Sequence, residues 1–189
     1  FNRLVTCEHA DLDLADQIAT REFFSVQKPE VVVLAAAKVG GINANSTFPA
    51  EFIYNNLAIQ ANVINEALRL DVQQLLFLGS SCIYPKIWNK PFKEEDLTLS
   101  QLERTNEFYA IAKIAGLKMC EAYNKQFCNS LPKFITIIPP NLFGENDNYN
   151  YQNGHVLAAL LRKFFEAKTR GYKTVKVWGT GKVKREFLF

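Results

Sequence analysis

Three short apolar runs constrain the fold of this chain more than any other feature. They are Val31–Ala37, Leu75–Gly79 and Phe134–Ile138. None of them alternates regularly between apolar and polar residues, which is typical of parallel strands buried on both faces. A chain of 189 residues with 48% hydrophobic content is long enough to bury such strands in one core. We therefore expect a globular protein built around a parallel sheet.

The segments between these runs have helical periodicity. Residues 49–68 place their apolar side chains on one face of a helix of about five turns, with Pro49 at its start. Residues 107–127 repeat the pattern, and an earlier helix is expected at about 14–27, ending near Lys28. Strands that alternate with helices predict the α/β class and a doubly wound parallel sheet of the Rossmann-like type.

The character of the sequence changes after Pro139-Pro140, which end the last strand. An asparagine-rich loop at 141–153 is followed by a predicted helix at about 155–168 and an extended stretch at 174–178. We therefore divide the chain into a Rossmann-like domain, residues 1–140, and part of a small substrate-binding domain, residues 141–189.

Charge and cysteine content restrict the kinds of partner and the cellular compartment that we expect for this chain. The 22 basic residues are scattered among 19 acidic ones, which argues against binding to nucleic acid. Four cysteines and two histidines have no spacing that suits a zinc site, so we expect no metal and a reducing compartment. No apolar run approaches the roughly 18 residues of a spanning helix, and no secretion signal opens the chain. We expect a soluble cytoplasmic protein without a membrane partner.

Both ends of the chain suggest an internal piece of a longer protein. The sequence starts at Phe1 without a methionine, and it closes on an extended run, Arg185–Phe189. A strand at that position would present an unpaired edge. We therefore expect a sheet that is truncated at its N-terminal βα unit.

The strongest chemical signal is a Tyr-x-x-x-Lys motif, Tyr109 and Lys113, on a predicted helix. Four residues apart, the two side chains share one helix face, so the ammonium is expected to lower the pKa of the phenol from about 10. Ser80 directly follows the preceding strand, where open α/β sheets bind their ligands. The spacing alone is a weak signal, because many amphipathic helices carry it. With Ser80 it predicts proton exchange with an alcohol or a carbonyl group.

Five segments resemble the GDP-L-fucose synthases, a branch of the extended short-chain dehydrogenase/reductase family. They are Ala35–Ile42, Gly79–Pro85, Tyr109–Gly116 and the pair Trp178–Gly181 with Arg185–Leu188. Members of that branch use NADPH to convert GDP-4-keto-6-deoxy-D-mannose into GDP-L-fucose, inverting two ring carbons beside the ketone and then reducing it. The resemblance implies NADP as cofactor and a GDP-sugar as substrate. It also implies a homodimer that pairs the helix carrying Tyr109 with the preceding helix, through apolar faces around Phe52 and Ile114.

The resemblance also assigns roles to single residues. Ser80, Tyr109 and Lys113 match the reductase triad, and Cys82 with His155 matches the acid-base pair of the epimerisation. Two residues after Ser80 on an extended segment, Cys82 would point to the same side. Without the resemblance, a cysteine here is most often a small buried apolar residue, and such a histidine is most often a surface or helix-capping residue.

Binding residues follow from the same resemblance. Cofactor contacts are implied for Ala35, Ala36, Lys38, Tyr109 and Lys113, and substrate contacts for Asn141, Arg162, Lys163, Trp178 and Arg185. The two arginines suit the diphosphate because their planar fork can bind two oxygens. Lys163 and Trp178 are candidates for the guanosine end of the substrate. Each of these charged residues could instead be a solvated surface residue.

Departures from the family pattern leave alternatives open. Phe108 and Pro140 stand where these enzymes usually have proline and threonine, and the glycine-rich turn that cradles the pyrophosphate would precede Phe1. A nucleotide-sugar 4-epimerase or 4,6-dehydratase shares the serine and Tyr-Lys pattern. A dehydratase would carry an acidic pair where Cys82 and Ile83 stand. The remaining alternative is a catalytically silent Rossmann-like protein or an inactive fragment.

Overall fold

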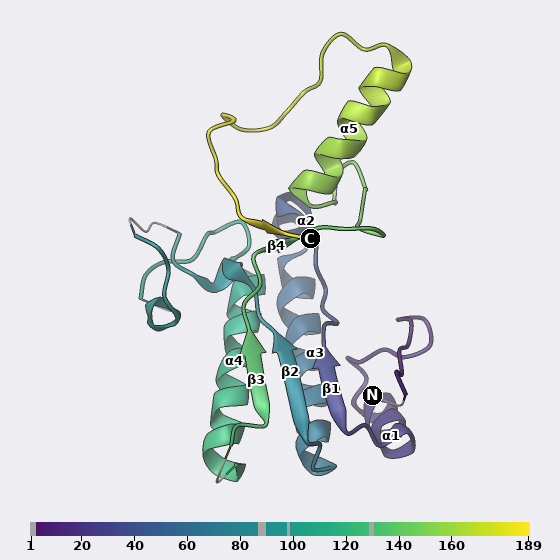
Figure 1. The fold of residues 1–189 in the computed structure, drawn as a ribbon, viewed down its shortest axis with the longest axis vertical. Helices are drawn as coiled ribbons and strands as arrows, with labels where there is room; N and C mark the ends of the chain where they lie inside the picture. The colour runs from purple at the N-terminus through teal and green to yellow at the C-terminus, as the bar shows by residue number, and fades with distance from the viewer. Residues whose placement is uncertain (1–2, 87–89, 98, 129–130) are drawn as a thin grey trace.

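The main sheet of the molecule has three parallel strands. In the computed structural model, which describes residues 3–86, 90–97, 99–128 and 131–189, the strand order is β1-β2-β3 (Figure 1). The strands are β1 (Val31–Leu34), β2 (Gln74–Leu78) and β3 (Phe134–Ile137). Leu75 of β2 lies opposite Val32 on one side and Phe134 on the other. The predicted parallel α/β arrangement is confirmed, and the three apolar runs pair in register.

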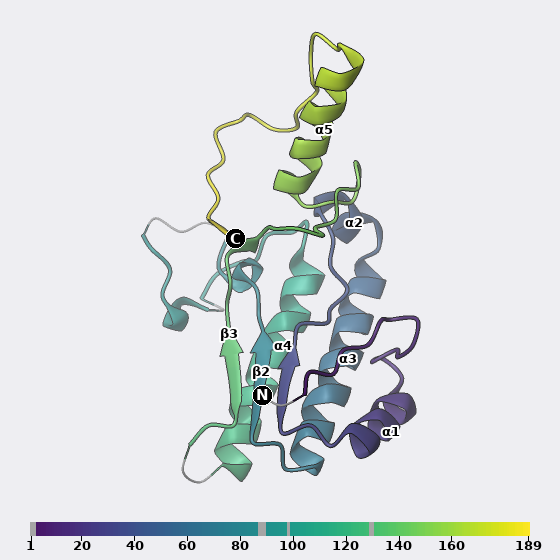
Figure 2. The ribbon, with the colours of Figure 1, turned by 45° about the vertical axis from the view of Figure 1, so that its right-hand side comes forward.

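Two long helices connect the strands. α3 (Pro49–Arg69) and α4 (Glu107–Phe127) lie side by side on one face of the sheet (Figure 2). Pro49 occupies the first turn of α3, where its missing N–H is not needed. The core between helices and sheet is built from fully buried apolar side chains, among them Ile64, Ala67, Leu75 and Phe77. This packing fixes α4 against the end of β2.

The first helix, α1 (Gln17–Gln27), packs against α3 and begins later than its periodicity predicts. Asp16 is its N-cap, and the carboxylate accepts hydrogen bonds from the N–H groups of Ile18 and Ala19. Lys28 ends the helix in the left-handed conformation, close to the predicted stop. The N-cap excludes the residues before Asp16 from the helix.

Gly116 lets α4 approach β2 and α3 closely. A Cβ atom there would lie 2.5 Å from Cζ of Phe77 and 2.7 Å from Oε1 of Gln60. The amide of Gln60 donates a 2.6 Å hydrogen bond to the carbonyl of Ala112, one residue before Lys113. The height of Tyr109 and Lys113 above the sheet therefore depends on this glycine.

We expect Gly116→Ala to lower the free energy of unfolding by about 1–3 kcal/mol, because overpacking against Phe77 outweighs the gain in helix propensity. Urea denaturation measures the change. Gly144→Ala is the control, since the nearest atom to its Cβ is 4.0 Å away. A Gly116→Ala protein that unfolds at the same or a higher urea concentration contradicts this account.

A second group of elements stands beyond the carboxyl ends of β1, β2 and β3 (Figure 1). It contains α5 (Val156–Arg170) and two short parallel strands, β4 (Asn141–Leu142) and β5 (Phe187–Leu188). The terminal run is therefore paired with β4 on one side, and its other side is the unpaired edge of this two-stranded sheet within the described residues. The predicted loop 141–153 begins with this strand, and the stretch 174–178 forms no strand.

Two surface features bear on partners. The face of the sheet opposite α3 and α4 is open within the described residues, where Val33 is 61% and Ile137 is 41% exposed. Phe52 is only 2% exposed, so its own side chain does not contribute to an outward dimer face, whereas Ile114 is half-buried against a core cluster. None of the described helices is long and apolar enough to cross a membrane.

Candidate active site

Ser80 leaves β2 at its carboxyl end and starts a tight turn. The hydroxyl oxygen of Ser80 accepts a 3.3 Å hydrogen bond from the N–H of Cys82 and so caps the single 3-10 turn Ser81–Ile83 (η1). The segment is therefore coiled, and the expected alternation of an extended strand does not hold. Cys82 is half-buried and lies close enough to Tyr109 to act on it electrostatically.

Tyr109 lies in the first turn of α4. Its ring packs edge-to-face against the ring of Phe52, with 6.4 Å between the two ring centroids. Burial raises the pKa of Tyr109 to about 12, and the nearby Cys82 adds to this rise, while a hydrogen bond with Ser80 acts in the opposite direction. The expectation of a lowered pKa is wrong for this state of the site, because desolvation dominates. Tyr109 is a protonated phenol at neutral pH and can donate its proton.

Lys113 joins α4 to the end of β2. Its ammonium donates a 2.8 Å hydrogen bond to the carbonyl of Leu78 and lies 4.8 Å from the ring centroid of Phe77. The centroid of the Tyr109 ring is 5.9 Å away. Burial lowers the pKa of Lys113 to about 8. The positive charge thus lies under the ring of Tyr109 and is held by the backbone.

The residues after β1 form a second edge of the site. Ala35 and Ala36 are exposed, so a ligand can approach their backbone closely. The side-chain amide of Asn56 forms two 3.0 Å hydrogen bonds with the backbone of Lys38. It accepts one from the N–H and donates one to the carbonyl. The ammonium of Lys38 pairs with Glu51. Sequence reasoning missed Asn56, although a polar residue on the buried face of a helix is a usable signal.

His155 is the N-cap of α5 and is exposed, with no hydrogen bond from its side chain to the helix. The loop before His155 contacts the segment that follows β1, because the N–H of Gly41 donates a 3.0 Å hydrogen bond to the carbonyl of Asn153. A Cβ on Gly41 would lie 2.8 Å from the carbonyl oxygen of Gly154. His155 is thus tied to the segment after β1, and among the described residues no hydrogen bond joins its side chain to Cys82.

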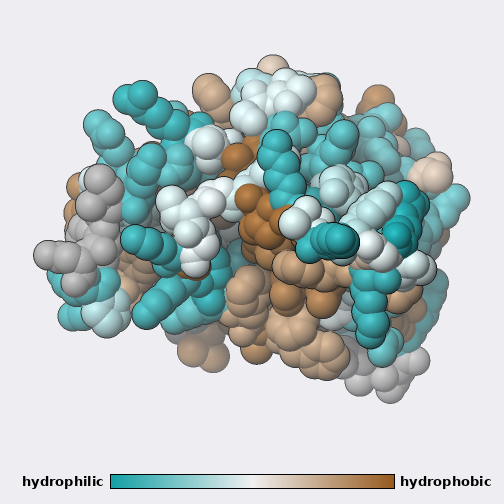
Figure 3. Space-filling view, turned by 90° about the horizontal axis from the view of Figure 1, so that it is seen from above, coloured by the Kyte–Doolittle hydropathy of each residue, from teal (hydrophilic) through white to brown (hydrophobic). Residues whose placement is uncertain are grey.

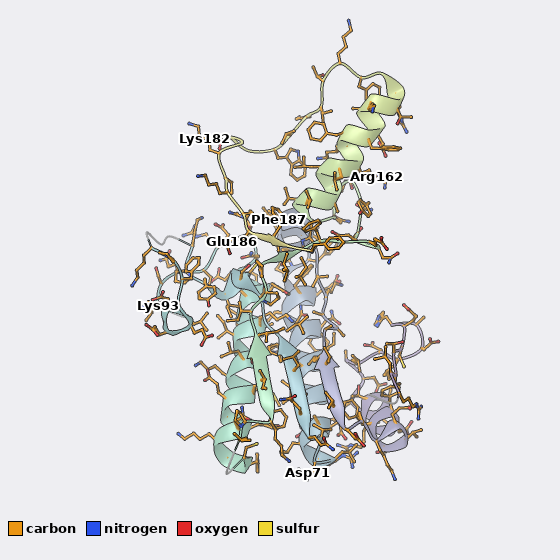
Figure 4. All side chains as sticks on the ribbon, viewed as in Figure 1. Asp71, Lys93, Arg162, Lys182, Glu186 and Phe187 are labelled. Carbon is orange, nitrogen blue, oxygen red and sulfur yellow. The ribbon has the colours of Figure 1, made fainter. Side chains whose placement is uncertain are left out.

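Three predicted substrate residues are engaged with their own neighbours. The side chain of Asn141 donates to the carbonyl of Glu186 at 3.0 Å and ties β4 to β5. Arg162 forms a 2.7 Å ion pair with Glu166 one turn along α5, and Figure 4 shows it above the β4–β5 pair. Arg185 donates to the carbonyl of its neighbour Lys184 at 3.0 Å. These contacts satisfy part of each side chain's capacity for hydrogen bonds.

Lys163 and Trp178 do come together. The ammonium of Lys163 lies 5.0 Å from the ring centroid of Trp178 and 4.9 Å from that of Tyr151. Tyr151 belongs to the asparagine-rich loop and was not predicted as a site residue, because no local pattern connects it with α5. Seen from above, apolar residues form a band from the middle of this face to its lower edge, with hydrophilic residues to the left and right of it (Figure 3).

A cavity of about 490 Å³ lies elsewhere, between α4, β3 and the side chains of Tyr84, Glu94 and Leu97. Tyr84, Leu117 and Phe134 are among its lining residues, and none of the predicted site residues lines it. The chemical groups instead converge where Ser80, Cys82 and Tyr109 meet. A phenol and a hydroxyl that share a hydrogen bond can hold one carbonyl oxygen, and the adjacent thiol can exchange a proton with carbon.

The sequence matches a known protein family over its whole length. The model of the NAD dependent epimerase/dehydratase family matches residues 1–189. GDP-L-fucose synthase 1 of Arabidopsis thaliana is 55% identical over 188 residues, which cover 100% of this chain and 57% of that protein. GDP-L-fucose synthase of Escherichia coli (strain K12) is 50% identical over 185 residues, 98% of this chain and 57% of the relative.

Among solved structures, a GDP-L-fucose synthetase from Naegleria fowleri bound to NADP has a TM-score of 0.86 at 32% identity. The alignment covers 97% of this chain and 59% of that one. The likeness supports the Rossmann-like interpretation of the parallel sheet. The chain spans about 57% of the length of the two curated relatives described above.

Proposed function

Because the chain belongs to the NAD dependent epimerase/dehydratase family, we propose that the natural protein containing it converts GDP-4-keto-6-deoxy-D-mannose into GDP-L-fucose with NADPH. The observation that carries the proposal is the cluster of Ser80, Cys82 and Tyr109 at the carboxyl end of β2. The identities of 55% and 50% to GDP-L-fucose synthases favour this substrate over other nucleotide sugars.

The epimerisation half of the reaction needs a stabilised oxygen and a proton carrier. In our proposal, Ser80 and Tyr109 bind the ketone oxygen, so that the protons on the neighbouring ring carbons become acidic and an enolate can form. Cys82, beside Tyr109, and His155 act as a pair: one removes the proton from the ring carbon as the base, and the other delivers a proton to the opposite face of that carbon as the acid, which inverts it.

The reduction half needs a hydride and a proton. NADPH supplies the hydride when bound, and Tyr109, a protonated phenol, donates the proton to the ketone oxygen. The small exposed residues Ala35 and Ala36 after β1 fit a cofactor that approaches the backbone, and Asn56 holds the backbone of Lys38 in place for it. Lys113 would contact the ribose and stabilise the phenolate that Tyr109 leaves behind.

We also propose how the protein is organised. Residues 1–140 would form the cofactor domain, and residues 141–189, with Asn141, Arg162, Lys163, Trp178 and Arg185, part of the substrate domain. A homodimer through α3 and α4 would use their exposed apolar side chains, Tyr54 at 68% and Ile111 at 39% exposure. The free thiols of all four cysteines support a cytoplasmic location.

The natural protein should oxidise NADPH when it is given GDP-4-keto-6-deoxy-D-mannose, and the product should be GDP-L-fucose. Absorbance of NADPH and chromatography of the product measure this. GDP-mannose is the control, because it lacks the ketone and should leave NADPH unchanged. Turnover of UDP-sugars with no NADPH oxidation on the GDP-ketosugar would instead favour a nucleotide-sugar 4-epimerase or 4,6-dehydratase.

A further inference from the structure

Lys163 is a nearly buried cation held by two aromatic rings. It lies on the first half of α5 and is only 9% exposed. Its ammonium is 4.9 Å from the ring centroid of Tyr151, before the helix, and 5.0 Å from that of Trp178, after it. Both distances are within the range in which a ring face attracts a cation. Three separate segments therefore meet at one ammonium group.

The charge of Lys163 is not neutralised within the described part of the chain. None of the ion pairs formed by the described residues involves Lys163, and neither do their side-chain hydrogen bonds. By contrast, Arg162 is paired with Glu166 and Lys38 with Glu51. Rings attract a cation through their quadrupole without cancelling its charge. The N–H donors of Lys163 are thus not used by another described side chain and can bind an incoming anion.

We propose that Tyr151 is a positioning residue whose ring, together with that of Trp178, holds the ammonium of Lys163 for an oxygen of the substrate diphosphate. The inference rests on the proposed GDP-sugar substrate and assigns Lys163 to its phosphates, not to guanosine. A flexible lysine normally loses side-chain entropy when it binds an anion. Two rings that fix its stem and head before binding reduce this loss.

A double-mutant cycle on the natural protein tests the role of Tyr151. GDP and guanosine are titrated by calorimetry into the wild type, Tyr151→Leu, Lys163→Met and the double variant. We expect Tyr151→Leu to raise the Kd for GDP about three- to tenfold and to leave guanosine binding unchanged, since only the phosphates meet Lys163. In the Lys163→Met background, Tyr151→Leu should have no further effect. Tyr151→Phe keeps the ring and should stay within about twofold of the wild type.

Contrary results overturn either the role of Tyr151 or the proposed substrate, and the experiment tells the two apart. An equal loss for guanosine would mean that Tyr151 supports the fold or contacts the base. An unchanged loss in the Lys163→Met background would mean that it acts independently of that cation. If the wild type binds UDP and not GDP, the proposed substrate is wrong, and the same cycle with UDP and uridine decides the role of Tyr151. If the wild type binds no nucleoside diphosphate, no such subsite exists.

Discussion

Replacing Lys113 by methionine should lower the rate of ketone reduction by about two orders of magnitude or more, the usual size of an acid-base contribution. The ammonium lies 5.9 Å from the centroid of the Tyr109 ring, and burial makes the phenolate costly, as the raised pKa of Tyr109 shows. Without the positive charge, the phenolate that remains after proton donation has less stabilisation. The decay of NADPH absorbance in a single turnover measures the rate.

Lys118→Met is the matched control for this experiment. Lys118 lies on the same helix, is largely exposed and pairs with Glu121, so its loss should change the rate by less than about twofold. If the Lys113→Met variant reduces the ketone at the rate of the wild type at neutral pH, proton donation by Tyr109 does not depend on this charge.

The fold should tolerate the loss of Lys113. Burial lowers its pKa from 10.5 to about 8, so the folded state disfavours the ammonium relative to the unfolded chain. This penalty is fully present below about pH 8 and disappears as the pH rises to 10.5. Methionine carries no such penalty, which offsets the lost hydrogen bond to Leu78 at neutral pH. If the Lys113→Met variant is slow but keeps the melting temperature of the wild type, its lower rate results from the lost catalytic contribution of Lys113 and not from unfolding.

Replacing Cys82 by serine should largely abolish the exchange of substrate ring protons with deuterated water. Serine is nearly the same size, but its hydroxyl is far less acidic than a thiol with a pKa of about 8.5. Reduction of the ketone that has not been epimerised should continue. His155→Gln should impair the same stage, because the proton carrier then lacks its partner. Mass spectrometry after incubation in heavy water measures the uptake.

Cys128→Ser serves as the control for the exchange experiment. Cys128 is also half-buried, but it caps the far end of α4, away from Ser80 and Tyr109. Its replacement should leave deuterium uptake unchanged. Undiminished uptake in both Cys82→Ser and His155→Gln would mean that these residues are structural and that the protein is a plain reductase.

Much of the sheet and its helices could be predicted because their signals are local. The apolar runs at Val31 and Leu75 and the periodicity of α3 and α4 are readable within a few residues each. The pairing of β4 with β5 could not be predicted in the same way. It joins the backbone of Asn141 and Phe143 to the carbonyls of Glu186 and Leu188, 45 residues later, and the side chain of Asn141 adds one further hydrogen bond to Glu186. No short pattern encodes such a contact.

The same difference between local signals and contacts of distant residues applies to the candidate site. Ser80, Tyr109 and Lys113 were expected to meet, and the structure brings them together at the end of β2. The direction of the pKa shift of Tyr109 was predicted wrongly, because helix spacing indicates proximity to Lys113 and says nothing of burial. The pairing of Tyr151 with Lys163 joins a loop to a helix face and was likewise not readable from the sequence.

The most direct test of the proposed function is the mass of the product formed in heavy water. The natural protein is incubated with GDP-4-keto-6-deoxy-D-mannose and NADPH, or NADPH deuterated at the transferred position, and exchangeable hydroxyl deuterium is washed out. The account predicts two deuterium atoms from solvent on ring carbons with NADPH, and a third with the deuterated cofactor. Reduced product without solvent deuterium on carbon would contradict the epimerase role of Cys82, and deuterated sugar without transfer from the cofactor would contradict the reductase role of Tyr109.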